Sequence, residues 1–260
     1  MHRNIADVEA KEVSQGLWER TLLRPEDTTH GQLTIKHFTI KPGSSVSFTD
    51  ELVEYQHYVI SGCAYWYRTY HHSDTAIFIP GNRAKHSIAQ AGESDLIMLT
   101  HIYKIPKPTF RWGKARAFNY WQAQYLHEAG AGAIAHQLIT EEQHAVSGAY
   151  RMHALDVQTN PPRNDLPAHT NPEETMYFLR GTGEALSEGR RERVRPGSLI
   201  YTPVGVEHGI FNTHDSLPLQ YVVVEYIEHD KAWTERGYQA PSLTHEGFGD
   251  VTLEKHGGSS

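Results

Sequence analysis

The stretch Gly197-Ser-Leu-Ile-Tyr-Thr-Pro203-Val-Gly205-Val-Glu-His208-Gly-Ile-Phe-Asn212 decides the fold of this chain. Its apolar start predicts a buried strand, Pro203 and Gly205 predict a tight turn, and the residues around His208 predict a second strand. A strand fixes the direction of its side chains, so this segment presents one imidazole from a rigid position. A second polar cluster, His169-Thr-Asn171-Pro-Glu173-Glu174, comes earlier in the chain. Together the two segments predict a β-barrel that assembles a metal site from two hairpins.

The sequence contains an internal duplication. The segment from Gly31 to about Lys104 and the segment from Ser147 to about His229 show the same succession of alternating strands, glycine-ended strands and Pro/Gly turns. Matching points lie about 120 residues apart, which is typical of a repeated unit. We therefore expect one β unit to occur twice. The clearest matches are Tyr55–Gly62 with Glu174–Gly181, His86 with His208, and Leu96–Tyr103 with Leu219–Ile227.

This pattern predicts an all-β fold of two tandem small barrels or sandwiches with a few short helices. We expect a first domain at 1–120, which includes an N-terminal arm, and a second at 147–235. Residues 121–146 are expected to connect them, with short helices near Tyr120–Glu128 and Ile139–Ala145, and 236–260 are expected to form a tail.

Composition excludes several classes of partner. The formal charge is −7 over 260 residues and there is no long run of Lys or Arg, which argues against nucleic acid or an acidic membrane as a partner. Apolar stretches are strand-sized, so no membrane span is predicted. The single cysteine, Cys63, rules out an intramolecular disulfide, and the first residues show no apolar signal-peptide core. We therefore expect a cytoplasmic protein.

His169, Glu174 and His208 are the candidate metal ligands, with Asn171 as an additional weak oxygen ligand. Side chains alternate along a strand, so Glu174 shares a face with Met176 and Phe178. If that face looks inward, one carboxylate and two imidazoles converge and leave open positions on a divalent metal. The alternative is that His169 and Glu174 are exposed loop residues and His208 is a hydrogen-bonded barrel histidine.

The run Gly197-x5-Pro203-x-Gly205-x2-His208-x3-Asn212 resembles the second signature motif of the cupin superfamily at every fixed position. The run from His169 to Gly181 resembles the first cupin motif, in which two histidines and a glutamate precede a glycine. One histidine is missing there: either Asn171 replaces the second or Pro167 replaces the first. The resemblance implies two tandem jelly-roll-like cupin barrels, a bicupin, with His169, Glu174 and His208 as ligands. One divalent metal per chain is expected, with Fe(II) favoured and Mn, Ni, Co or Zn as alternatives.

The first copy departs from this pattern, because Tyr55 occupies the position that matches Glu174. His57 and His86 could still meet inside that barrel, with Glu54 near them. We expect this barrel to have lost its metal and to act as a structural partner.

The resemblance and the ligand set predict a metal-dependent enzyme that acts on a small oxygenated organic acid, with a non-haem dioxygenase favoured. The alternatives are a metal-dependent lyase, isomerase or decarboxylase, and a cupin that binds a small molecule without turnover. His153 or Glu173 is the candidate base that moves a proton, and Arg180 is a candidate partner for a substrate carboxylate. We also expect a homodimer.

Overall fold

The structure, a computed structural model, describes residues 1–29, 31–50, 52–81, 85–104, 115–122, 124–127, 134–139, 150–163, 165–170 and 173–228. Strands dominate these ranges, and short 3-10 helices occur at η1 (Ile5–Asp7), η2 (Pro25–Asp27) and η4 (Tyr120–Gln122). No helix in the described ranges has the length and apolar character needed to cross a membrane. The all-β prediction is confirmed.

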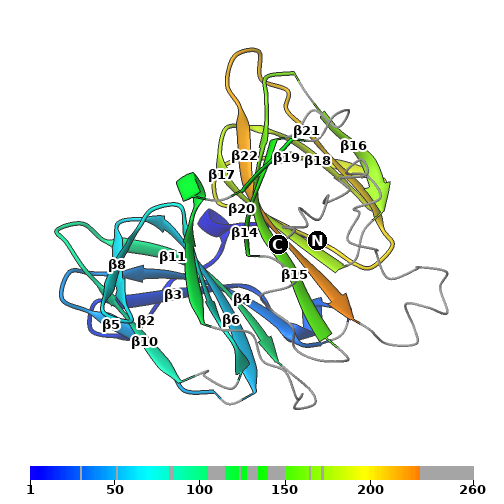
Figure 1. Ribbon diagram of the computed structural model, residues 1–260. Helices are drawn as coiled ribbons and strands as arrows, with labels where there is room; N and C mark the ends of the chain where they lie inside the picture. The colour runs from blue at the N-terminus through cyan, green and yellow to red at the C-terminus, as the bar shows by residue number, and fades with distance from the viewer. Residues whose placement is uncertain are drawn as a thin grey trace, which may run out of the picture.

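The first half of the chain forms one barrel from two antiparallel sheets (Figure 1). The first large sheet has the order β12-β9-β6-β11-β4-β3-β2, and the first small sheet has the order β5-β10-β7-β8. The strands of the large sheet are β2 (Lys11–Ser14), β3 (Leu17–Leu23), β4 (Leu33–Ile40), β6 (Val53–Ser61), β9 (Thr75–Ile79), β11 (Leu96–Lys104) and β12 (Arg116–Asn119). Those of the small sheet are β5 (Ser45–Phe48), β7 (Cys63–Trp66), β8 (Thr69–His72) and β10 (His86–Gln90).

The second half repeats this arrangement. The second large sheet has the order β1-β20-β17-β22-β15-β14-β13, and the second small sheet has the order β16-β21-β18-β19. The strands of the large sheet are β1 (His2–Asn4), β13 (Gln124–His127), β14 (Ile134–Ile139), β15 (Tyr150–Asn160), β17 (Glu173–Arg180), β20 (Ser198–Thr202) and β22 (Leu219–Glu228). Those of the small sheet are β16 (Asp165–Thr170), β18 (Gly183–Ser187), β19 (Arg190–Val194) and β21 (Glu207–Phe211).

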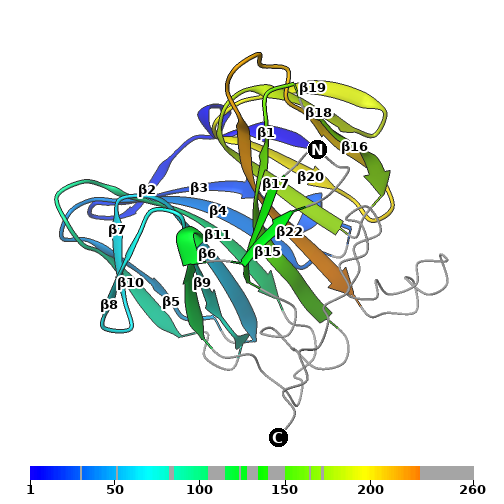
Figure 2. The same cartoon turned by 45° about the horizontal axis from the view of Figure 1, so that its top comes forward.

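One strand in each barrel comes from an unexpected part of the chain. In the first barrel, β9 pairs with β12, which follows the last strand of that repeat. In the second barrel, the equivalent strand β20 pairs with β1, which comes from the start of the chain and lies with the second barrel (Figure 2). The N-terminal residues that we expected to belong to the first domain therefore contribute a strand to the second large sheet.

The stretch 121–146, which we expected to connect the barrels, contributes two strands to the second large sheet. The predicted helix over Tyr120–Glu128 is wrong beyond its first turn, because η4 ends at Gln122 and β13 follows it. Pairing of β13 with β14 overrides the local helix pattern. Of the second predicted helix, Ile139 ends β14 and residues 140–145 lie outside the described residues.

Apolar side chains form three cores. One fills the first barrel and includes Phe38, Ile88 and Met98, and another fills the second barrel and includes Met176, Phe178 and Ile210. The third lies between the barrels and joins the outer faces of the two large sheets, with residues from both halves. The two barrels are therefore held together by an apolar interface, whose aromatic members are Tyr58, Phe78, Tyr103, Tyr177, Tyr201 and Tyr226.

Two glycines at matching positions end the strands that carry the central residues of each barrel. Gly62 follows β6 and Gly181 follows β17, and both have a positive φ, +85° and +78°. A Cβ at Gly62 would collide with the carbonyl oxygen of Asp95, and one at Gly181 with that of Pro218. Only glycine fits both the backbone angle and the close approach, which explains why the sequence repeats it.

Candidate metal centre

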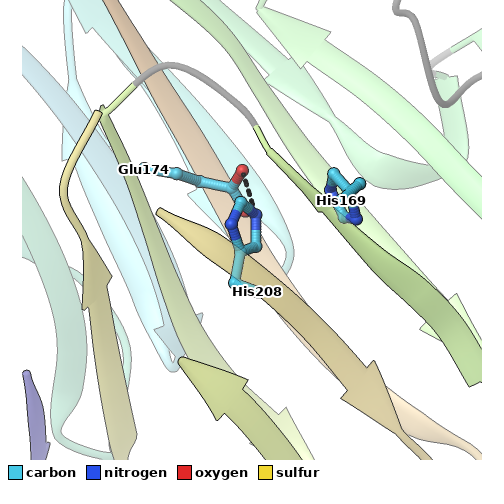
Figure 3. A group of neighbouring side chains, drawn as sticks. All are labelled: His169, Glu174 and His208. Atoms are coloured by element: carbon cyan, nitrogen blue, oxygen red, sulfur yellow. Dashed lines mark hydrogen bonds and ion pairs between the residues drawn. The ribbon is translucent and has the colours of Figure 1, made fainter. Parts of the chain in front are cut away.

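His169, Glu174 and His208 meet inside the second barrel. Their candidate ligand atoms all lie within 4.8 Å of one another. Glu174 and His208 are 2% and 1% exposed, whereas His169 is partly exposed. Figure 3 shows Glu174 and His208 joined by a hydrogen bond, with the His169 ring beside them on the neighbouring strand. The three residues come from β17, β21 and β16, so both sheets of the barrel contribute.

Strand register brings the two histidines together. β16 pairs with β21, and His169 lies directly opposite His208 with ring centroids 4.5 Å apart. Glu174 lies at the start of β17, where Met176 and Phe178 on the same face belong to the core of the second barrel. The predicted inward face of β17 is therefore the observed one.

The Pro203–Gly205 turn orients the His208 ring. The Val206 amide donates to the Pro203 carbonyl oxygen over 3.2 Å, which closes the turn. The Nδ1 of His208 donates to the Val206 carbonyl oxygen over 2.9 Å, because that oxygen can only accept. The Nε2 is thereby directed at Glu174, whose Oε2 lies 3.2 Å away. A backbone carbonyl that fixes the second nitrogen is the usual support for a metal-binding histidine.

The charge of His208 depends on its neighbours. Burial lowers the pKa of its imidazole, but the Glu174 carboxylate raises it by charge and by hydrogen bonding, and the net direction is upward. The backbone contact to Val206 and the charge of Glu225 act in the same direction. The raised pKa means that Glu174 favours a proton on the His208 ring, at the nitrogen that would face a cation. A metal that binds there displaces that proton.

Glu225 is a residue of this site that the sequence analysis missed. It lies on β22 directly opposite Glu174 in the strand register and is 5% exposed. Burial raises the pKa of its carboxyl group well above the usual range, Glu174 raises it further, and His208 opposes the change. A glutamate inside the apolar run Val222-Val-Val-Glu225-Tyr226 is the sequence signal that could have identified it.

The structure does not bring all predicted residues to this centre. Glu173 lies on the opposite face of β17, where its Oε1 accepts a hydrogen bond from the Tyr201 hydroxyl at 2.6 Å. Arg180 lies at the far end of β17, about 20 Å along the strand from Glu174. It is exposed and its Nη2 is 3.4 Å from Asp74 Oδ2. Asn171 and the side chain of His153 lie outside the described residues.

The equivalent position in the first barrel is built differently. His86, the counterpart of His208, lies opposite Phe48 in the register, and Tyr55 lies opposite Ile102. Phe48 stacks on His86 with ring centroids 4.7 Å apart. Phe48, Tyr55 and Ile102 therefore replace His169, Glu174 and Glu225, and the phenylalanine and isoleucine offer no ligand atom.

His57 fills the remaining space of this first-barrel site. Its Nε2 is 2.8 Å from the Nε2 of His86, so one ring donates to the other, and its Nδ1 is 3.0 Å from Thr100 Oγ1. Burial, His86 and His101 all lower the pKa of His57, which keeps it neutral. The predicted meeting of His57 and His86 is confirmed. Glu54 does not join them, because its neighbours on the same face of β6 point into the interface between the barrels.

The donor set of the second barrel fits a divalent metal. Two imidazole nitrogens and one carboxylate oxygen, gathered in a largely buried site, are the ligands that Fe, Mn, Co, Ni and Zn share. A buried carboxylate is costly without a cation or hydrogen-bond partner, and here it faces two imidazoles rather than apolar groups. Among the described residues, His169, Glu174 and His208 are the one set of at least three such side chains close enough together to share a metal ion.

Comparisons with known proteins agree with this architecture. Residues 156–225 match the family model described as "Cupin domain". No curated protein matches the chain by sequence. Two similar solved structures are the protein Ylba from E. coli (12% identity, 88% of this chain and 91% of that one, TM-score 0.68) and a putative glyoxylate-induced protein from Pseudomonas aeruginosa (11% identity, 84% of each chain, TM-score 0.70).

A third similar structure is a mutant of oxalate decarboxylase from Bacillus subtilis. It is 14% identical, the alignment covers 88% of this chain and 78% of that one, and the TM-score is 0.65. At these identities the likeness concerns the fold, and it extends over both barrels. Residues 156–225 thus form a cupin domain in the second half of the chain, and both barrels together share the fold of these structures.

Proposed function

We propose that this protein is a metal-dependent enzyme that acts on a small oxygenated organic acid, with oxygen-dependent chemistry at a non-haem iron centre favoured. The observation that supports this most directly is the convergence of His169, Glu174 and His208 within 4.8 Å. Two histidines and one carboxylate occupy at most three or four positions of a divalent metal and leave the others for substrate.

The chain's own residues would define the reaction site. His169 and His208 would bind through one ring nitrogen each, and Val206 would hold the His208 ring in place. Met176 and Ile210, each two residues after a ligand on the same strand, and Ile200 belong to the buried apolar core of this barrel. A bound divalent metal would act as a Lewis acid toward the carboxylate and hydroxyl or keto oxygens of a substrate and, as Fe(II), would supply one-electron chemistry for dioxygen.

One observation favours a second candidate, a metal-dependent decarboxylase or lyase. Glu225 places another carboxyl group beside Glu174, and a carboxyl group near the substrate position can donate or accept a proton. The similar B. subtilis oxalate decarboxylase is described with Mn(II) centres, so Mn(II) should be tested together with Fe(II).

Metal analysis of matched variants tests the proposal. His208→Ala should abolish stoichiometric Fe(II) or Mn(II) binding by the purified protein. His86→Ala removes the equivalent imidazole of the first barrel and should leave binding unchanged. Equal metal loss in both variants, or a wild-type protein that binds neither ion, would contradict the metal centre.

Turnover assays then separate the two reaction classes. The metal-loaded protein is incubated with 2-hydroxy, 2-keto and catecholic acids, with and without oxygen. Product formation with stoichiometric oxygen uptake supports the oxygenase. Equal turnover under anaerobic conditions supports the decarboxylase or lyase instead.

A further inference from the structure

The second barrel contains two buried glutamates that face each other from adjacent strands. Glu174 on β17 and Glu225 on β22 are direct partners in the antiparallel register. Side chains at such positions have Cβ atoms about 4.5–5.5 Å apart. Val223 and Tyr221 on the same face of β22 belong to the core of the second barrel, so Glu225 points inward as Glu174 does.

The first barrel provides an internal comparison for this pair. Its equivalent positions are Tyr55 and Ile102, which are partners in the same register. His169 likewise corresponds to Phe48, and only the histidine at the position of His208 is retained, as His86. The Glu225 carboxylate thus occurs in the barrel that has the ligand set, and it is absent from the barrel that lacks that set.

The presence of Glu225 together with the ligand set has an electrostatic explanation. Two carboxylates held side by side in an apolar barrel repel each other, and each loses its hydration. A divalent cation carries two positive charges, which balance the two negative charges of the carboxylates. The neutral imidazole ligands add no charge to the site. The oxygens of Glu225 lie outside the group of ligand atoms within 4.8 Å, so Glu225 lies beside the three ligands.

From this arrangement we infer that Glu225 is the second carboxylate of the metal centre, which raises the affinity of the site for a divalent cation by adding negative charge beside Glu174. The inference rests on the proposed function, because it requires that His169, Glu174 and His208 bind a metal. It adds a residue that the signature motifs do not contain, on the last strand of the barrel.

Titration of the metal-free protein with Mn(II), followed by the electron paramagnetic resonance signal of the free ion, tests this role. Glu225→Gln keeps the shape and removes the charge, and it should weaken Mn(II) binding by about 10- to 100-fold, the usual effect of removing a supporting group of a metal site. Glu225→Asp keeps the charge and should retain most of the affinity. Glu225→Ile reproduces the first barrel and should behave like Glu225→Gln, and it provides the measurement if the glutamine variant fails to fold.

The matched control is Glu173→Gln, which changes a buried carboxyl group on the opposite face of β17 and should leave Mn(II) affinity unchanged. Circular dichroism checks the fold of every variant. Wild-type affinity in Glu225→Gln, or equal losses in the aspartate and glutamine variants, would overturn the inference while the metal centre stands. A wild-type protein that binds no Mn(II) or Fe(II) would instead overturn the proposed function.

Discussion

Tyr103 and Tyr226 stack on each other between the two barrels, with ring centroids 5.8 Å apart and ring planes at 9°. They are equivalent residues of the two repeats, because Tyr103 lies opposite Glu54 in its sheet and Tyr226 lies opposite Glu173 in the other. A residue that contacts its own counterpart marks an approximate two-fold axis, as in a symmetric dimer. The duplicated chain therefore joins its two barrels as a dimer joins its subunits.

Truncation of this contact should destabilise the whole protein. Tyr226→Ala removes a fully buried ring from the core that joins the barrels, and we expect the free energy of unfolding to fall by about 3–5 kcal/mol. Denaturant unfolding measures the change. Tyr67→Ala, at a ring that is 79% exposed, should change stability by less than about 0.5 kcal/mol. A loss below about 1 kcal/mol in Tyr226→Ala would show that the stacked pair contributes little.

Metal should stabilise the second barrel. If His169, Glu174 and His208 bind Mn(II) or Fe(II) in the folded state alone, free metal at one hundred times its dissociation constant adds about 2.7 kcal/mol to the free energy of unfolding. Thermal melts with metal and with a chelator measure this shift. Glu174→Ala should abolish it. A shift of equal size in that variant would place the bound metal elsewhere.

Acid should weaken the interface between the barrels through two buried histidines. Burial lowers the pKa of His37 to about 4 and that of His101 to about 3, from an ordinary value of 6.5. Below pH 6.5 the unfolded chain takes up protons that the folded chain does not, so stability falls as the pH decreases. The two groups together give a slope of up to about 2.7 kcal/mol per pH unit between pH 6 and 4.

A substitution isolates the contribution of His101. His101→Gln should remove about half of this slope in denaturant unfolding measured across pH 4–7. The exposed His72→Gln should leave the slope unchanged. An unaltered slope in His101→Gln would show that His101 does not stay neutral in the folded protein.

Glu54 should destabilise the fold at neutral pH. Neither of its carboxylate oxygens has a hydrogen-bond partner among the described residues, and burial raises the pKa of the group well above 4.5. Its counterpart Glu173 accepts a hydrogen bond from Tyr201, but the residue equivalent to Tyr201 in the first barrel is Phe78, which has no hydroxyl.

The sign of the effect follows from the raised pKa. Above pH 4.5 the unfolded chain loses the Glu54 proton while the folded chain retains it, so stability falls as the pH rises. Glu54→Gln does not titrate and should be about 1–3 kcal/mol more stable than the wild type at pH 7, with the difference shrinking toward pH 4.5. Glu173→Gln should bring no such gain. A less stable Glu54→Gln would indicate that the carboxyl group has a stabilising partner.

Local patterns in the sequence were sufficient to predict the strands shared by the two repeats, the duplication and the convergence of His169, Glu174 and His208. Each depends on alternation along one strand or on a turn of a few residues, such as Pro203–Gly205. The fold also confirms the inward face of Glu174. The homodimer and the cytoplasmic location stay predictions.

Features that depend on pairing between distant segments could not be predicted in this way. Glu225 was not predicted because its role depends on its position opposite Glu174 on the neighbouring strand. The sequence of β22 alone does not show which residue lies opposite. The strand β13 lies in a stretch with a helical pattern, and its pairing with β14 decides its conformation. Nothing in His2–Asn4 indicates a partner near Ile200.

The pairing of β1 with β20 constrains how the protein can be made. β1 is synthesised about 200 residues before its partner β20, so the second barrel can close only after both halves of this sequence have been made. A fragment that starts after the first barrel would leave the edge of β20 unpaired, and open strand edges invite aggregation. Although the two barrels repeat one architecture, the second one borrows an edge strand from the first half of the sequence and would lose it on separation.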